Sequence, residues 1–170
     1  MKTESAGWLD SNVILRYLLN DHADHSARAR ALIEAAEAGA HRLKVALHIL
    51  CEVVYILESE RYAREEIYGA IRDFMGIRGI EVEEEDIALE ALTDYRDKGV
   101  DFSDALLAAV ARKSQESVWT FKKAFRAHGW PMANPACGID SFSAVETPFQ
   151  GKGAMVTCRK TVGAPPQPAS

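Results

Sequence analysis

The stretch that decides the fold runs Gly7-Trp8-Leu9-Asp10-Ser11-Asn12-Val13-Ile14-Leu15-Arg16-Tyr17-Leu18-Leu19. Gly7 to Asp10 is short and apolar up to its final carboxylate, and we expect a strand there. The apolar run from Asn12 to Leu19 predicts a helix directly after it. In parallel α/β sheets, functional sites form where strands end and helices begin, so Asp10 stands where a site residue is expected.

Further along the chain, short apolar segments continue to alternate with segments of helical periodicity. More strands are expected at Arg42–Ala46, Ile80–Val82 and Val118–Phe121. Helices are expected at Ala23–Ala38, Leu47–Glu58, Ala63–Met75, Glu84–Asp97, a segment capped by Asp101 or Ser103 that ends near Ser114, and Lys122–His128. This alternation predicts an α/β fold, in which helices cover both faces of a central parallel sheet in a three-layer α/β/α sandwich.

The character of the sequence changes near its C-terminal end. All six prolines of the chain lie from Pro131 onward, and helical periodicity disappears there. We therefore expect residues 1–129 to form the α/β domain and residues 130–170 to form an atypical Pro/Gly-rich tail of irregular structure. Within this tail a short strand is expected around Ala154–Cys158, and disorder is expected in Gly163–Ser170.

The composition is that of an ordinary globular protein. The chain has 170 residues, of which 48% are hydrophobic and 26% charged, enough for one domain with a substantial core. No apolar run approaches the roughly 18 residues of a membrane span, and Met1–Gly7 lacks the apolar core of a secretion signal. A cytoplasmic location is therefore expected. The net charge of −5 argues against a broad phosphate-binding surface, so any contact with nucleic acid is expected to be local.

Cysteines and histidines show no pattern of a metal or catalytic site. The three cysteines are far apart and form no C-x-x-C pair, which gives zinc-ribbon and thioredoxin-like sites no support. Cys51 lies in an apolar run and is expected to be a buried thiol. No metal spacing or triad pattern connects the five histidines, His22, His25, His41, His48 and His128.

Three carboxylates stand out, and each has a structural and a functional interpretation. Asp10 is either the N-cap of the helix after it or a site residue, since Ser11 can cap the helix instead. Glu52 interrupts an apolar helix at the flank of its stripe, where a partly buried carboxylate needs a partner. Asp104 lies in the first turn of the helix begun by Asp101, where an anion complements the helix dipole.

Two predicted apolar stripes place these acids on their helices. The first stripe, on the helix that carries Glu52, comprises Ile49, Leu50, Val53, Ile56 and Leu57. The second stripe comprises Leu106, Leu107 and Val110, and Asp104 lies beside it. Both stripes are expected to face the core.

If the strands are parallel, Asp10, Glu52 and Asp104 can converge at one end of the sheet. Carboxylates that share a site repel one another and are stable as anions only around a cation. Hard oxygen ligands favour Mg²⁺ or Mn²⁺ over zinc. The pattern therefore predicts a divalent-metal site rather than a Ser, Cys or His nucleophile.

Four ordered segments of this chain resemble the motifs of PIN domains, especially those of VapC-type toxins from bacterial toxin–antitoxin pairs. The segments are Leu9-Asp10-Ser11-Asn12-Val13-Ile14-Leu15-Arg16-Tyr17-Leu18, Leu50-Cys51-Glu52-Val53-Val54-Tyr55-Ile56-Leu57, Asp101-Phe102-Ser103-Asp104-Ala105-Leu106-Leu107-Ala108-Ala109 and Val118-Trp119-Thr120-Phe121. Their order and spacing also agree with the family, over about Leu9 to Gly129. Four ordered motifs are far more specific than any one of them.

The resemblance implies a sheet of four or five parallel strands and metal-dependent hydrolysis of phosphodiester bonds, usually of RNA. It also implies Mg²⁺ or Mn²⁺ as cofactor, an antitoxin protein as partner, and a homodimer. The acids at the matching positions are Asp10, Glu52 and Asp104. Ser11, Asn12 and Thr120 match positions that usually support the site.

Lys122 departs from the family pattern. The fourth motif of the family normally continues Thr-Phe-Asp, whereas this chain has Thr120-Phe121-Lys122. An ammonium group there disfavours a second metal by repulsion. It can take that metal's place, pair with Asp104, or contact phosphate, and Asp101 can compensate as a metal ligand.

Three functions stay open at this point. The first is a metal-dependent ribonuclease toxin, and the second is a catalytically degenerate PIN domain that binds RNA or protein. The third is a structural domain whose acids serve as caps and surface charges. A basic cluster of Lys122, Lys123 and Arg126 either guides a phosphate backbone or complements the dipole of its helix.

Overall fold

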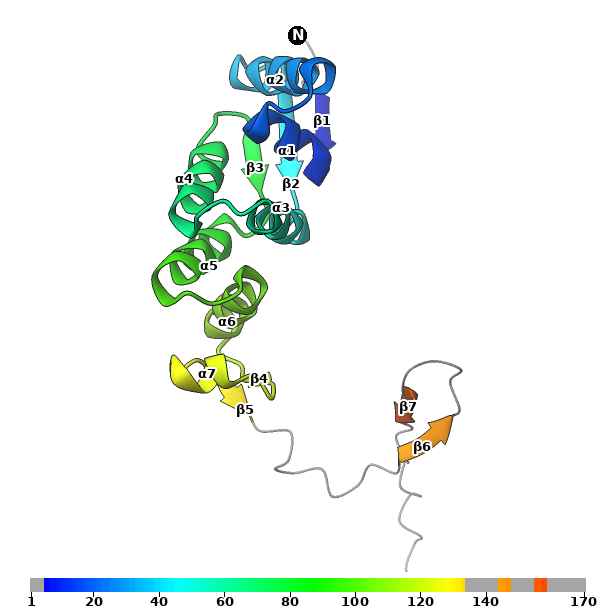
Figure 1. Cartoon of the computed structure of the whole chain (residues 1–170), viewed down its shortest axis with the longest axis vertical. Coiled ribbons are helices and arrows are strands. Elements are labelled where there is room, and N and C mark those ends of the chain that lie inside the picture. Colours follow the sequence, from blue (N-terminus) through cyan, green and yellow to red (C-terminus); the bar gives the residue numbers. More distant parts are fainter. Residues whose placement is uncertain (1–4, 134–143, 148–154, 159–170) are drawn as a thin grey trace, which may run out of the picture. The chain divides into compact units, whose positions relative to one another are not determined.

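The computed structural model describes residues 5–133, 144–147 and 155–158 (Figure 1). The chain divides into two compact units, each of which is described by itself. The first unit comprises Met1–Val118 and Lys122–Met132, and the second comprises Trp119–Phe121 and Ala133–Ser170.

A parallel sheet lies in the first unit, with the strand order β1-β2-β3 (Figure 1). Its strands are β1 (Ser5–Trp8), β2 (His41–Val45) and β3 (Ile80–Val82), and both strand pairs are parallel. The first strand begins earlier than expected. It ends at Trp8, but the Leu9 N–H still donates to the Lys44 carbonyl oxygen at 2.8 Å. Asp10 therefore follows immediately after the last ladder bond of this strand.

Seven helices alternate with the strands in the described part of the chain. They are α1 (Ser11–Leu19), α2 (Ala23–Glu37), α3 (Leu47–Ser59), α4 (Arg64–Met75), α5 (Glu85–Lys98), α6 (Phe102–Ser114) and α7 (Lys123–Ala127). Their bounds agree with the predicted helices to within a residue or two, and the predicted α/β class is confirmed. None of these helices has the length and apolar character needed to cross a membrane.

The prediction of four or five strands in one parallel sheet differs from the structure, where this sheet has three among the described residues. The segment expected as a strand at Val118–Phe121 is shorter, because β4 covers only Val118–Trp119. The Val118 N–H donates to the Pro131 carbonyl oxygen at 3.1 Å. Its hydrogen bond thus goes to the segment before β5 (Met132–Ala133) and not to the parallel sheet.

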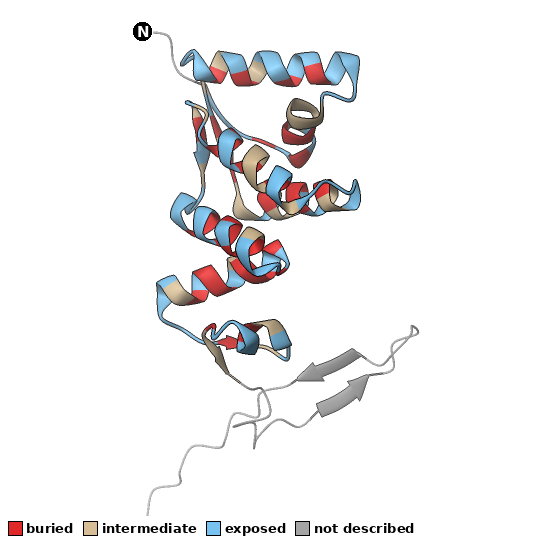
Figure 2. Cartoon of the chain, turned by 60° about the vertical axis from the view of Figure 1, so that its left-hand side comes forward, coloured by how far each residue is buried: buried red, intermediate tan, exposed pale blue. Residues whose placement is uncertain are grey.

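Burial on α3 is centred differently from the predicted stripe. The fully buried residues are Leu50, Val53, Val54 and Leu57. Ile49 and Ile56 are only half-buried, whereas Val54 is buried. The core-facing side of α3 is therefore centred nearer to Val54 than the predicted stripe is. Figure 2 shows how the buried residues line one side of each long helix.

The predicted stripe on α6 is wrong. Leu107 and Val110 are 46% and 39% exposed, and the helix packs through its alanines instead. The buried alanines of α5 and α6 are Ala88, Ala91, Ala105, Ala108, Ala109 and Ala111. Small side chains allow close approach of the two helices, and burial therefore follows the alanine face rather than the larger apolar residues.

Two further strands lie in the second unit. They are β6 (Ala144–Thr147) and β7 (Met155–Cys158), which pair antiparallel. The strand expected around Ala154–Cys158 is confirmed as β7, whereas β6 lies in a segment expected to be irregular. The disorder expected for Gly163–Ser170 falls outside the described residues.

Gly79 is required at the start of β3. Its φ is +87°, and a Cβ there would lie 2.5 Å from the carbonyl oxygen of Ala36. Its own carbonyl oxygen accepts from the Leu43 N–H at 2.8 Å, which joins this turn to β2. A side chain at residue 79 would therefore disturb both the turn and the packing of α2.

We expect Gly79→Ala to lower the free energy of unfolding by about 2 kcal/mol or more, because it combines left-handed strain with a backbone clash. Urea denaturation followed by circular dichroism measures the change. Gly69→Ala in α4 is the matched control, since a Cβ there meets nothing within 4 Å. It should raise stability by about 0.5–1 kcal/mol, as alanine does in a helix interior. Equal effects of the two variants would contradict the role of Gly79.

Candidate active site

Asp10 is the N-cap of α1, and its two neighbours hold its carboxylate. Oδ1 accepts from the backbone N–H of Ser11 at 2.9 Å, and Oδ2 accepts from the Asn12 side-chain amide at 3.3 Å. The Asp10 side chain is exposed to solvent. A carboxylate offers about four acceptor positions, so these bonds orient the group and leave capacity for a further ligand.

Glu52 is exposed on α3, and the prediction that it is partly buried is wrong. The reason is the shift of the buried face towards Val54, which turns Glu52 to the outer side of the helix. Tyr55 is also exposed there, and residues three apart in a helix are neighbours on its surface. Glu52 is thus available to a ligand from solvent.

A pocket of about 460 Å³ lies between α3 and the start of α6. Its lining residues are Cys51, Glu52, Val54, Tyr55, Glu58, Asp101, Phe102 and Ser103. Asp101 occupies the N-cap position of α6, but its side chain makes no capping hydrogen bond. Two candidate acids, Glu52 and Asp101, therefore line one pocket from different elements.

Cys51 is half-buried in this pocket rather than fully buried as expected, and its thiol forms no disulfide. Burial raises the pKa of the thiol. The neutral thiol is consequently favoured at neutral pH, which agrees with a structural and not a nucleophilic role.

Asp104 is buried in the first turn of α6 and is paired with a lysine. Its side chain is 11% exposed, and Oδ1 lies 2.5 Å from the Lys122 Nζ. The lysine side chain is 55% exposed, so the ammonium group approaches the buried carboxylate from the surface. Of the alternatives left open for Lys122, the structure has the pairing with Asp104. Any metal ion at Asp104 would have to compete with this ammonium group.

Thr120 belongs to the second unit, whereas the candidate acids belong to the first. It is half-buried, and its N–H donates to the Ala133 carbonyl oxygen at 3.5 Å. A supporting role for Thr120 at the acids stays a prediction.

Asp10, Asp104 and the pocket lined by Glu52 and Asp101 are three separate local settings in this structure. Within residues 5–133, 144–147 and 155–158, no three His, Cys, Asp or Glu side chains form a group that could hold a metal ion. The pocket lined by Glu52 and Asp101 brings two of the candidate acids to one hollow of the surface.

Comparison with known proteins identifies the family. Residues 8–131 match the model of the PIN domain family. The chain belongs to the PIN domain family. The resemblance found in the four motifs is thereby confirmed, and all candidate acids of this PIN domain lie within the matched segment.

Among solved structures, the PIN domain is similar to the crystal structure of Mycobacterium tuberculosis VapC20, described as a toxin that cleaves the sarcin–ricin loop. The identity is 19% and the TM-score 0.33, over 77% of this chain and 100% of that chain. No curated protein matches this sequence.

Arg64 links α3 to the segment before α6, and these two elements form the sides of the pocket. No pattern in the sequence identified this residue. Its Nη1 donates to the carbonyl oxygens of Tyr95 at 3.1 Å and Val100 at 2.5 Å. Its Nη2 lies 3.4 Å from the Glu58 carboxylate, and its guanidinium stacks on the Tyr95 ring at 4.4 Å from the centroid. The Tyr95 hydroxyl donates to Glu58 at 3.0 Å.

This cluster, which we call the Arg64 clamp, comprises Arg64, Glu58, Tyr95 and the Val100 carbonyl. Burial, and then the hydrogen bond to Glu58, raise the pKa of Tyr95, so its hydroxyl stays a donor at neutral pH. Glu58 lines the pocket on α3, and Val100 immediately precedes Asp101. The clamp therefore holds the segment that presents Asp101 against the helix that presents Glu52.

We expect Arg64→Ala to lower the free energy of unfolding by about 2–3 kcal/mol, because it leaves two carbonyl oxygens and Glu58 without their charged donor. The pocket should also open. In a background with Cys137 and Cys158 replaced by serine, alkylation of Cys51 should become several-fold faster.

Arg96→Ala is the matched control for this experiment. Arg96 also stacks on a tyrosine, at 4.0 Å from the Tyr68 centroid, but its partners Glu65 and Asp97 lie away from the pocket lining. This change should cost less stability than Arg64→Ala and leave the alkylation rate of Cys51 unchanged. Equal alkylation rates in both variants would refute a role of the clamp at the pocket.

Proposed function

We propose that this PIN domain is a divalent-metal-dependent endoribonuclease that hydrolyses RNA phosphodiester bonds as the toxin of a toxin–antitoxin pair. Family membership supports the nuclease class, since residues 8–131 match the family model. The observation that carries the proposal is the surface pocket that Glu52 and Asp101 both line. It is an accessible pair of hard oxygen ligands, suited to Mg²⁺ or Mn²⁺.

In this proposal the acids have different tasks. Glu52 and Asp101 hold the cation, and Asp10 and Asp104 are the further acids of the site. Ser11 and Asn12 keep the Asp10 carboxylate oriented through their hydrogen bonds. When bound, the metal lowers the pKa of a coordinated water and neutralises charge on the phosphate.

Contact with RNA is expected to be local, because the chain carries a net charge of −5. Lys123 and Arg126 are exposed on α7 and can meet a phosphate backbone. The proposal also includes a cognate antitoxin, a homodimer and a cytoplasmic location as consequences of the toxin function.

The pair of Lys122 and Asp104 favours a second candidate, a catalytically degenerate PIN domain that acts as a binding protein. A buried carboxylate that already has an ammonium partner gains less from a metal ion. A protein of this kind would have the PIN fold and bind RNA or a protein partner, but it would not hydrolyse RNA.

Cleavage of a mixed RNA substrate with Mg²⁺ or Mn²⁺ tests both candidates. We expect the unmodified chain to cleave RNA and Asp10→Asn to lose at least about tenfold in rate, since it removes the charge of one acid of the site. Lys122→Asp is the informative third variant. Activity that appears only in Lys122→Asp would establish the degenerate candidate, and no cleavage by any of the three would overturn the nuclease.

Thermal unfolding tests the cation site separately from catalysis. Mn²⁺ at about 100 times its dissociation constant should stabilise the folded chain by ~2.7 kcal/mol, because only the folded state assembles the site. Glu52→Gln and Asp101→Asn should each reduce this gain. Glu65→Gln is the matched control, since Glu65 is 75% exposed on α4 and does not line the pocket. A gain that persists in both pocket variants, or is absent from the unmodified chain, would exclude this pocket as the metal centre.

A further inference from the structure

A pocket of about 630 Å³ lies between α1 and α2, which pack against each other. Asn12, Val13 and Arg16 line it from α1, and His25 and Arg28 are among the residues that line it from α2. Residues three and four apart share one face of a helix, so each helix presents a continuous wall to this pocket. The proposed function assigns no ligand to it.

The polar groups of this pocket are hydrogen-bond donors. The guanidinium groups of Arg16 and Arg28 carry positive charge, and the imidazole of His25 and the side-chain amide of Asn12 can donate as well. No aspartate or glutamate occurs among its described lining residues. In a chain with a net charge of −5, such a group of donors creates a local positive potential, which attracts an anion.

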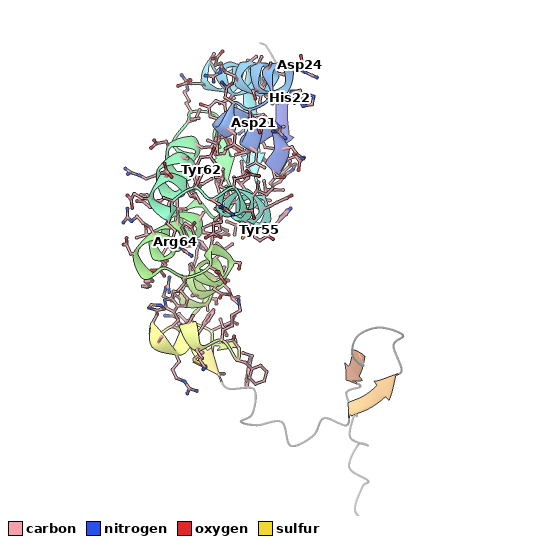
Figure 3. All side chains as sticks on the ribbon, in the orientation of Figure 1. Asp21, His22, Asp24, Tyr55, Tyr62 and Arg64 are labelled. Carbon is pink, nitrogen blue, oxygen red and sulfur yellow. The ribbon has the colours of Figure 1, made fainter. Side chains whose placement is uncertain are left out.

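Both arginines have aspartate partners that do not line the pocket. Arg28 Nη1 lies 3.9 Å from the Asp24 carboxylate, and Arg16 Nη1 lies 2.5 Å from that of Asp21, near the start of α2 (Figure 3). The side chains of Arg28 and Asp24 are 76% and 74% exposed. Exposed ion pairs contribute little to stability, and each guanidinium has five N–H donors. Both arginines therefore keep the capacity to bind a second anion.

The lining favours a phosphate that carries an organic group. A guanidinium fork matches two oxygens of a phosphate, which gives a charge-assisted bidentate contact. Val13, Ala29 and Leu32 supply apolar surface in the same pocket, which a free inorganic ion would leave uncovered. The volume lies in the range of small-molecule pockets and is sufficient for one nucleotide.

The pocket also adjoins a candidate acid. Asn12 lines the pocket, and its side-chain amide donates to the Asp10 Oδ2 at 3.3 Å. An RNA strand that is cut at the acids continues on both sides of the cleaved bond. Its flanking phosphates need cationic partners there, because the acids repel them. The position beside Asp10 therefore favours a phosphate of RNA over an acidic side chain of a protein as the ligand.

We propose that the pocket between α1 and α2 is a subsite for one nucleotide of an RNA strand, next to the nucleotides at the cleaved bond. Arg16 and Arg28 bind its phosphate, and the apolar residues of the pocket contact its ribose and base. The inference rests on the proposed RNA substrate and adds a binding site for that substrate outside the acids. Arg16 and Arg28 are then substrate-binding residues.

Binding of a short fluorescein-labelled single-stranded RNA tests this subsite. It is measured by anisotropy on the full chain in EDTA, so that no metal-dependent cleavage occurs. We expect Arg28→Gln to weaken binding several-fold at low salt and to make the slope of log K against log[salt] less steep by about 0.7, the value for one phosphate contact on a single strand. Arg28→Lys keeps the charge, so it should retain the slope but lose part of the affinity, since an ammonium group has no planar fork.

Arg30→Gln is the matched control. Arg30 is exposed on the same helix, two positions after Arg28, and does not line the pocket. Residues two apart do not share a face of a helix, and both variants change the net charge equally. Arg30→Gln should therefore leave the affinity and the slope unchanged.

Competition identifies the ligand. AMP should displace the labelled RNA at a lower concentration than inorganic phosphate does, because only AMP covers the apolar surface. Equal displacement by the two would overturn the contact with ribose and base. Displacement by tetraglutamate at a lower concentration than by AMP would overturn the subsite in favour of an acidic protein segment.

The outcomes separate the subsite from the nuclease. Binding that depends on Arg28, together with no cleavage by the unmodified chain in Mg²⁺ or Mn²⁺, would support the subsite and overturn the nuclease. Equal affinities and slopes for Arg28→Gln and Arg30→Gln would overturn the subsite, whereas cleavage by the unmodified chain would still establish the nuclease. The absence of RNA binding by the unmodified chain would overturn the subsite as well.

Discussion

The Arg64 guanidinium is the group on which the arrangement of α5 and the start of α6 against α3 depends. A planar fork with five donors can bind backbone and side-chain acceptors at the same time, which a lysine ammonium cannot do in one plane. Here it reaches the carbonyl oxygens of Tyr95 and Val100 and the carboxylate of Glu58. These groups belong to three stretches of the chain, so one side chain holds the end of α5 and the entry to α6 against α3. The pocket between Glu52 and Asp101 exists because these elements are held together.

The second constraint is the buried charge of Asp104. A carboxylate out of water requires a cationic partner, and in this chain Lys122 supplies it. The ammonium group contacts the same carboxylate oxygen that a metal ion at Asp104 would need as a ligand. Lys122 therefore compensates the buried charge of Asp104 and disfavours a metal ion at that carboxylate. The metal centre that we propose uses instead the exposed Glu52 and Asp101, whose pocket has no lysine or arginine among its described lining residues.

Local patterns predicted most of the secondary structure and failed where burial depended on packing partners. Helix bounds followed hydrophobic periodicity and the positions of helix-terminating residues. An example is Gly99, whose φ is +66° and which ends α5. The face of α3 was misjudged because Val54, rather than Ile49 and Ile56, is turned to the core. On α6 the alanines are buried and Leu107 is exposed, since the short distance to α5 favours small side chains. Which face of α3 or α6 is buried cannot be predicted from the sequence of that helix alone.

By itself the sequence determined the α/β class, the order of helices and strands, the PIN family and the identity of the candidate acids. These properties follow from local periodicity and from motifs that are contiguous in the chain. Only the tertiary structure decided which of these acids line the same pocket. Glu52 and Asp101 are far apart in sequence, and the elements that bring them to one pocket are joined by a guanidinium whose acceptors lie 31 and 36 residues along the chain. Contacts of that range follow from packing and hydrogen-bond geometry, which no local pattern records.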